Sequence, residues 1–113
     1  MELHEKIKIN GIEVDCEIDT GTLYTVLKKD VLEKAGARPV KKILAKFADG
    51  HERTVNAYIE SIEVAGCKLP PIMIVEGDSN LLGHQVLQMM GAIIDEEKGE
   101  VKYRVCPSSI PKI

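Results

Sequence analysis

The sequence is poor in aromatic residues, because it has no tryptophan, one phenylalanine and three tyrosines among 113 residues. It also has no run of 18 apolar residues, which excludes a helix that spans a membrane. The net charge of −3 comes from 15 basic and 18 acidic residues that are mixed along the chain. No basic stripe indicates a nucleic-acid surface, so we expect neither nucleic acid nor a membrane among the partners.

Cysteines are few as well, and the first residues contain no apolar stretch of the kind found in a signal peptide. The three cysteines, Cys16, Cys67 and Cys106, are widely spaced, and we expect reduced thiols in the core of a cytoplasmic protein. The length fits one domain over residues 1–113. With 44% apolar residues a core is possible, but a core this poor in aromatics would gain from further burial in an oligomer.

Alternation of apolar and polar residues with a period of two dominates the chain and predicts an all-β fold. Two-residue turns predict three hairpins, at Asn10-Gly11, Asp49-Gly50 and Ala65-Gly66. The segments 92–95 and 100–105 predict a fourth pair of strands. Pro70 and Pro71 favour a sheet edge, and a slip of the apolar phase at Glu60-Ser61 indicates a bend.

Two short segments, 28–36 and 84–91, predict helices that each end at a capping glycine. The sequences VLEKAGA (31–37) and VLQMMGA (86–92) share Val, Leu, Gly and Ala in register. Upstream of each, an apolar strand runs into a glycine, in EIDTG (17–21) and in NLLG (80–83). The chain therefore reads as two related half-units, and we expect a small closed β-barrel with pseudo-twofold symmetry.

The first of these strands ends in Asp19, followed at once by Thr20 and Gly21. Such a sequence is common in ordinary turns. It also suits catalysis, because two carboxylates that share a proton can activate water and protonate a carbonyl oxygen. Only one Asp-Thr-Gly is present, so the second carboxylate would come from a second copy of the chain. This chemistry would require a C2 homodimer with Asp19 near the axis.

The motif IDTGTLYTVL (18–27) resembles that of the retropepsin-like aspartic proteases, the retroviral type with one pepsin half per chain. NLLG (80–83) and GAIID (91–95) resemble the family's second half, and residues 45–66 occupy the place of its flap hairpin. The resemblance covers nearly the whole chain in the right order. It implies a retropepsin-like barrel, a homodimeric aspartic endopeptidase, an extended peptide or protein substrate, and neither a metal nor an organic cofactor.

The resemblance also implies roles for individual residues. Asp19 would be the catalytic aspartate, Thr20 would brace the pair across the dimer, and Gly21 would let the substrate backbone lie close. The remaining expected contacts with substrate come from the loop after the motif, the flap tip and the second half-unit: Thr22, Leu23, Tyr24, Phe47, Ala48, Asp49, Gly50, Ser79 and Leu81.

The sequence departs from the retroviral pattern in three places. Leu23 and His84 stand where retroviral enzymes pair an Asp with an Arg, so we expect a different way of bracing the dimer. The flap tip has one glycine, Gly50, which predicts a stiffer flap. Pro107 and Pro111 fit poorly in an interleaved terminal sheet.

Two other classes of function remain open at this point. A non-catalytic peptide-binding or dimerisation module could use the same fold, with Asp19 as a hydrogen-bonding group. A redox or metal protein could use the cysteines, although His4, His51 and His84 have no metal-site spacing with them.

Overall fold

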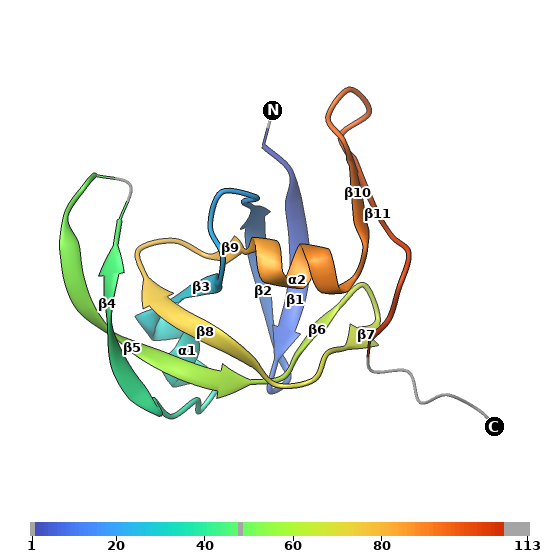
Figure 1. Cartoon of the computed structure of the whole chain (residues 1–113). Helices are drawn as coiled ribbons and strands as arrows, with labels where there is room; N and C mark the ends of the chain where they lie inside the picture. Colours follow the sequence, from blue (N-terminus) through green and yellow to red (C-terminus); the bar gives the residue numbers. More distant parts are fainter. Residues whose placement is uncertain (1, 48, 108–113) are drawn as a thin grey trace.

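The computed structural model describes residues 2–47 and 49–107 (Figure 1). The strands are β1 (His4–Ile9), β2 (Ile12–Ile18), β3 (Thr25–Lys28), β4 (Lys41–Lys46), β5 (Glu52–Glu60), β6 (Ile62–Val64), β7 (Cys67–Lys68), β8 (Ile72–Gly77), β9 (Leu81–Leu82), β10 (Ala92–Asp95) and β11 (Glu100–Tyr103). The helices are α1 (Lys29–Lys34) and α2 (His84–Met89). Among the described residues, no helix is long and apolar enough to cross a membrane. The mostly-β fold predicted from the sequence is confirmed.

Nine strands form one mixed sheet in the order β4-β5-β8-β3-β9-β2-β1-β6-β7, and β10 pairs with β11 in a separate hairpin. The closed barrel expected from the sequence is not found in the described residues, since β4 and β7 stand at opposite ends of the sheet without pairing. Alternation shows which face of a strand is buried, and it carries no information on whether the last strand meets the first.

The hairpins follow the predicted turns. Asn10 and Gly11, and likewise Ala65 and Gly66, all have positive φ, as a type I′ turn requires. The segment around Asp49-Gly50 joins β4 to β5. The bend predicted at Glu60-Ser61 is the point where β5, paired with β8, gives way to β6, paired with β1. Pro70 and Pro71 follow β7, which is an edge strand.

The two half-units are visible in the strand order. In the middle of the sheet, β2 of the first half-unit pairs in parallel with β9 of the second. In the same way, β3 of the first half-unit pairs in parallel with β8 of the second. Each unit runs strand, turn, strand and helix, and Gly36 and Gly91 both end their helices with positive φ. One equivalence expected from the sequence is wrong. Gly83 directly precedes α2, so its counterpart is Lys28, the last residue of β3, which directly precedes α1, and not Gly21.

The core lies between the sheet and the two helices. It consists of apolar side chains from both half-units, with Leu32 of α1 and Val86 and Leu87 of α2 against the strands. Tyr58 is the buried aromatic residue of this core. Aliphatic side chains therefore provide nearly all of the apolar burial, as the composition indicates.

The prediction of three reduced cysteines is wrong for two of them. Cys67 of β7 and Cys106 form a disulfide, while Cys16 is a free, buried thiol. The pair is separated by 39 residues, and sequence spacing gave no sign that the edge strand meets the segment after β11. The same segment is also held by the amides of Arg104 and Val105, which both donate to the Met90 carbonyl oxygen.

Candidate active site

Asp19 follows directly after β2, at the centre of the sheet. Its backbone N–H donates to the Leu82 carbonyl oxygen at 3.0 Å, so the end of β2 is tied to β9. Its carboxylate Oδ1 accepts a hydrogen bond of 2.9 Å from the backbone N–H of Gly21. This bond closes a tight Asp-Thr-Gly turn, and Asp19 is half-buried.

The segment from Asn80 to Gln85 supports the loop that follows this turn. The N–H groups of His84 and Gln85 donate to the carbonyl oxygens of Thr22 and Leu23, at 2.7 and 2.9 Å. They lie in the first turn of α2, whose N–H groups have no partner within the helix. The start of α2 thus holds the loop that follows Asp19.

Thr25 is a supporting residue to which the sequence analysis assigned no role. It is the fully buried polar residue of β3, and its Oγ1 accepts a hydrogen bond of 3.2 Å from the Gly83 N–H. Gly83 itself packs directly on the backbone, since an added Cβ would lie 2.4 Å from the Tyr24 carbonyl oxygen. Thr25, in the motif IDTGTLYTVL (18–27), could have been recognised from the sequence, because a threonine at a core position of a strand needs a hydrogen-bond partner.

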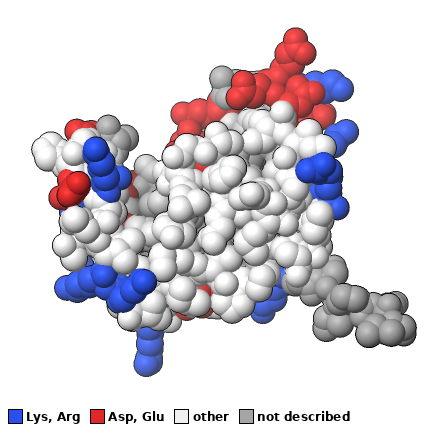
Figure 2. All heavy atoms as spheres, in the orientation of Figure 1, with Lys and Arg blue, Asp and Glu red and all other residues white. Residues whose placement is uncertain are grey.

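A cleft of about 860 Å³ lies between this loop and the β4–β5 hairpin. Figure 2 shows it as a notch between the hairpin and the body of the molecule. One side is formed by the loops after β2 and β8, and the other by residues of the hairpin. Its walls are mainly apolar, and Leu23 and Leu44 are 56% and 67% exposed. Apolar side chains left open in a concave site are typical of a ligand-binding cleft.

Most of the predicted site residues meet in this cleft. Those that line it are Asp19, Gly21, Thr22, Leu23, Tyr24, Phe47, Asp49, Ser79 and Leu81. Thr20 is exposed on the turn, and neither it nor Gly50 is among the described lining residues. Ala48 lies outside the described residues. The Thr22 hydroxyl faces the Tyr24 carbonyl oxygen at 3.5 Å, a long contact within its own loop.

Several lining residues were missed by the sequence analysis. They are Val26, Ile43, Leu44, Ala45, Lys46, Val75 and Asp78. Val75 and Val26 are paired across adjacent parallel strands, a neighbourhood that sequence alone does not show. The residues of β4 could have been found, since they immediately precede the predicted flap tip.

The flap hairpin carries two charged contacts at its tip. The Asp49 carboxylate accepts a 2.9 Å hydrogen bond from the His51 N–H, which is the main reason why the pKa of Asp49 lies below its usual range. The Arg53 guanidinium donates to the Asp78 carboxylate at 2.7 Å and so joins the hairpin to the loop after β8.

Within residues 2–47 and 49–107, no three side chains of His, Cys, Asp or Glu are placed to hold a metal ion. On the surface, His4 contacts the carboxylates of Glu2 and Asp15, and His51 contacts the carboxylate of Asp49. His84 is exposed at the start of α2. The site thus consists of the Asp19 carboxylate in a largely apolar cleft beside the β4–β5 hairpin.

Comparisons with known proteins agree with this geometry. The model of the family described as "gag-polyprotein putative aspartyl protease" matches residues 6–89, which is most of the chain. A search of the curated proteins found no match. Among solved structures, the fold resembles the retroviral protease-like domain of Ddi1 from Leishmania major, with a TM-score of 0.63 at 18% identity. That match covers 91% of this chain and 88% of the other, so the likeness extends over the whole fold.

Proposed function

Since the chain belongs to the family of gag-polyprotein aspartyl proteases, we propose that it is a homodimeric aspartic endopeptidase. The observation that carries the proposal is the position of the single Asp-Thr-Gly turn. Asp19 lines the cleft that the β4–β5 hairpin covers, together with nearly all other residues predicted to contact substrate.

The proposed reaction is attack of water on a peptide bond. One Asp19 carboxylate, ionised, takes a proton from the water as its oxygen attacks the carbonyl carbon. The Asp19 of the second chain, protonated, donates to the carbonyl oxygen. The tetrahedral gem-diol intermediate then collapses. The Asp19 that took the proton from water donates it to the leaving nitrogen, the C–N bond breaks, and the other Asp19 takes back a proton from a hydroxyl of the intermediate, which restores one ionised and one protonated carboxyl.

The binding mode follows from the shape of the cleft. An extended peptide would lie between the flap residues Phe47–Gly50 and the loop of Asp19, with backbone hydrogen bonds to both. The exposed side chains of Leu23 and Leu44 favour apolar residues on either side of the cut. Thr20, exposed on the turn, is free to brace the second copy as the family resemblance implies.

The dimer would be held differently from the retroviral one. After Tyr103 the described chain is not a strand, and Cys106 is linked to β7 of the same chain. Pro107 follows directly, whereas Pro111 lies outside the described residues. An intrachain disulfide and the bonds to Met90 keep this segment on its own protomer, so other surfaces must supply the dimer contacts.

The test is digestion of a complex peptide library by the wild-type protein and by Asp19→Asn, from acid to neutral pH. Asp19→Asn removes the shared acid and base, so cleavage should fall by at least about 100-fold. Asp30→Asn, on the exposed first turn of α1, is the matched control and should cut like the wild type. Specific activity should also fall on dilution below the dimer dissociation constant.

Two results would count against the proposal. Cleavage that survives in Asp19→Asn would place the chemistry elsewhere. If neither protein cuts at any pH while both remain folded dimers, a non-catalytic peptide-binding module becomes the better account. The cytoplasmic location stays a prediction, and the Cys67–Cys106 disulfide weighs against it, because disulfides persist mainly in oxidising compartments.

A further inference from the structure

The flap hairpin contacts the end of β8 and the residue that follows it through the side chains of Phe47 and Arg53, which also contact each other. The Arg53 guanidinium lies 4.0 Å from the centre of the Phe47 ring, and its Nη2 lies 2.7 Å from Oδ2 of Asp78. The Phe47 ring also lies over Gly77, because a Cβ at Gly77 would be 3.5 Å from the ring edge. We call Phe47, Arg53, Gly77 and Asp78 the flap cluster.

The flap cluster stands where backbone pairing ends. β5 pairs with β8 only from Glu60↔Ile72 to Ala57↔Val75. The first half of β5 pairs with β4 alone, so the outer part of the hairpin leaves the sheet. Among the described residues, the flap cluster is the side-chain bridge that holds this outer part to the body of the molecule. The cleft is open with these contacts formed, so they are compatible with a bound peptide.

Arg53 also balances negative charge at the flap end of the cleft. Two carboxylates line that end, those of Asp49 and Asp78. Arg53 is bonded to Asp78, and its charge adds to the effect of His51 in lowering the pKa of Asp49. Lys46 is the cation that lines the cleft itself. With Arg53 present, the charges of the two carboxylates, Lys46 and Arg53 sum to zero.

We propose that Arg53 is a positioning and specificity-determining residue of the proposed endopeptidase. It holds the flap over the cleft through Phe47 and Asp78, and it balances Asp49 and Asp78 so that the flap end accepts uncharged side chains. The inference rests on the proposed function for its effect on cleavage. Its effect on the flap does not depend on that function.

Two variants separate the two effects. Arg53→Met removes the bridge between the hairpin and Asp78, so it should raise KM about 3- to 10-fold. It also leaves the charges of Asp49 and Asp78 unbalanced, so the preference for Lys over Leu in the substrate should rise by a similar factor. Asp78→Asn weakens the same bridge but removes a negative charge. It should therefore raise KM without raising the preference for Lys over Leu in the substrate. For both variants kcat should stay within about twofold, because the reacting groups are untouched.

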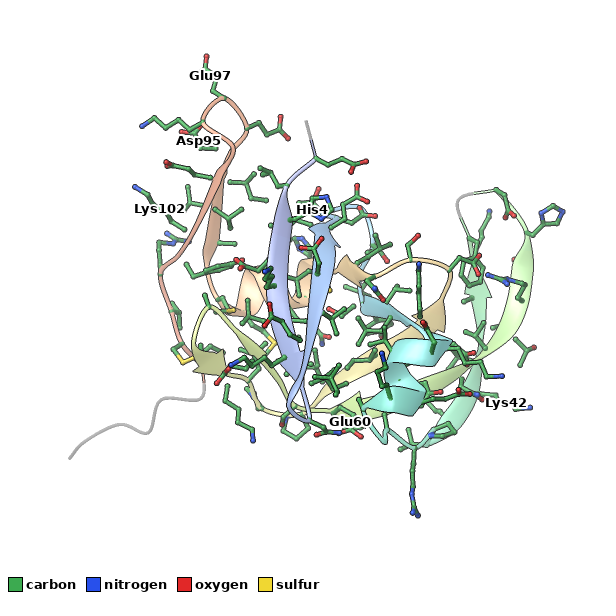
Figure 3. All side chains as sticks on the ribbon, turned by 180° about the vertical axis from the view of Figure 1, so that it is seen from behind. His4, Lys42, Glu60, Asp95, Glu97 and Lys102 are labelled. Carbon is green, nitrogen blue, oxygen red and sulfur yellow. A yellow bond between two sulfur atoms is a disulfide. The ribbon has the colours of Figure 1, made fainter. Side chains whose placement is uncertain are left out.

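The probes are one peptide cut by the wild type and its analogues with Leu, Lys or Glu at each position near the cut. Lys42→Met is the matched control, because Figure 3 shows Lys42 at the base of the hairpin, far from its tip. High salt should raise KM for the wild type and for Lys42→Met, but barely for Arg53→Met, since exposed ion pairs are screened.

Hydrogen exchange tests the flap independently of activity. Amides of residues 41–47 and 52–56 should exchange at least about threefold faster in Arg53→Met and in Asp78→Asn than in the wild type, with β1 and β2 unchanged. If the wild type cuts but Arg53→Met keeps its KM, its Lys-to-Leu preference and its flap exchange, the inference is wrong. If the wild type cuts nothing, the endopeptidase proposal fails. Unchanged exchange in Arg53→Met would then overturn the inference as well, and faster exchange would support it.

Discussion

Replacement of Gly83 by alanine tests the support of the loop that follows Asp19 most directly. The φ of Gly83 is −85°, which any residue adopts, so the substitution brings no backbone strain of its own. Its Cβ, however, would lie 2.4 Å from the carbonyl oxygen of Tyr24 and 2.9 Å from the amide nitrogen of Thr25. Both neighbours are backbone atoms, so no side-chain rotation relieves the contact.

The expected cost follows from what must move. Real Cβ contacts are not closer than 3.0 Å, so the backbone at Tyr24 has to shift by about 0.6 Å or more. An extra methyl group in a packed site costs about 1 to 3 kcal/mol. The shift also disturbs the bonds from His84 to Thr22 and from Gln85 to Leu23, each worth about 1 kcal/mol. The free energy of unfolding should fall by about 3 to 5 kcal/mol, a large part of the usual total of about 5 to 15.

Equilibrium unfolding in urea, followed by circular dichroism, measures this change. Gly66→Ala is the matched control, because its φ is +77° and nothing lies within 4 Å of the added Cβ. It should cost only the backbone strain, about 1 kcal/mol. If Gly83→Ala lost no more stability than Gly66→Ala, the close packing of α2 on the Asp19 loop would be refuted as a constraint.

Two further predictions concern the cysteines. Cys106→Ser opens the loop that the Cys67–Cys106 disulfide closes, so the free energy of unfolding should fall by about 3 to 4 kcal/mol. An unchanged midpoint of urea unfolding would contradict the disulfide. Burial raises the pKa of the Cys16 thiol from 9.0 to about 12, so iodoacetamide at pH 8 should label it only in urea, and rapid labelling of the native protein would contradict its burial. As the pH rises, the Cys16 thiol ionises in the unfolded chain before it ionises in the folded protein. The contribution of this thiol to the free energy of unfolding is therefore complete below pH 9 and is lost between pH 9 and 12. Cys16→Ala should not show this loss.

Local signals in the sequence account for most of the strands. Turns such as Asn10-Gly11 and Ala65-Gly66 require positive φ at both positions. Asparagine and glycine favour this conformation and are signals in the sequence, whereas Ala65 adopts it although alanine rarely does. Period-two alternation then sets which side chains face the core. The helices were equally accessible, because Gly36 and Gly91 mark their ends.

Long-range pairing was the part that the sequence did not determine. The partners of β3 are β8 and β9, some fifty residues away along the chain. No local pattern brings Cys67 to Cys106, or Arg53 to Asp78, because each pair depends on how separate hairpins are placed. The cleft was found largely because the order of motifs resembles a known family, whereas Asp78 and Thr25 belong to no motif with an assigned role.

The internal symmetry of the chain bears on why the proposed site would need a second chain. The repeats 31–37 and 86–92 are offset by 55 residues, so Leu27 corresponds to Leu82. In the parallel pairs, Leu82 is opposite Ile18 and Leu27 is opposite Glu76. Ile18 therefore corresponds to Glu76, and the next residues, Asp19 and Gly77, correspond to each other.

The second half-unit thus has no side chain where the first has its carboxylate. A Cβ at Gly77 would lie 2.4 Å from Cγ1 of Val26, and the Phe47 ring lies above the same position. Any larger residue there, aspartate included, would have to displace the side chain of Val26 in β3. The first half-unit therefore carries an aspartate at a position where the second is closely packed and carries a glycine. A single chain consequently supplies one carboxylate, and the proposed acid–base chemistry requires the Asp19 of another copy.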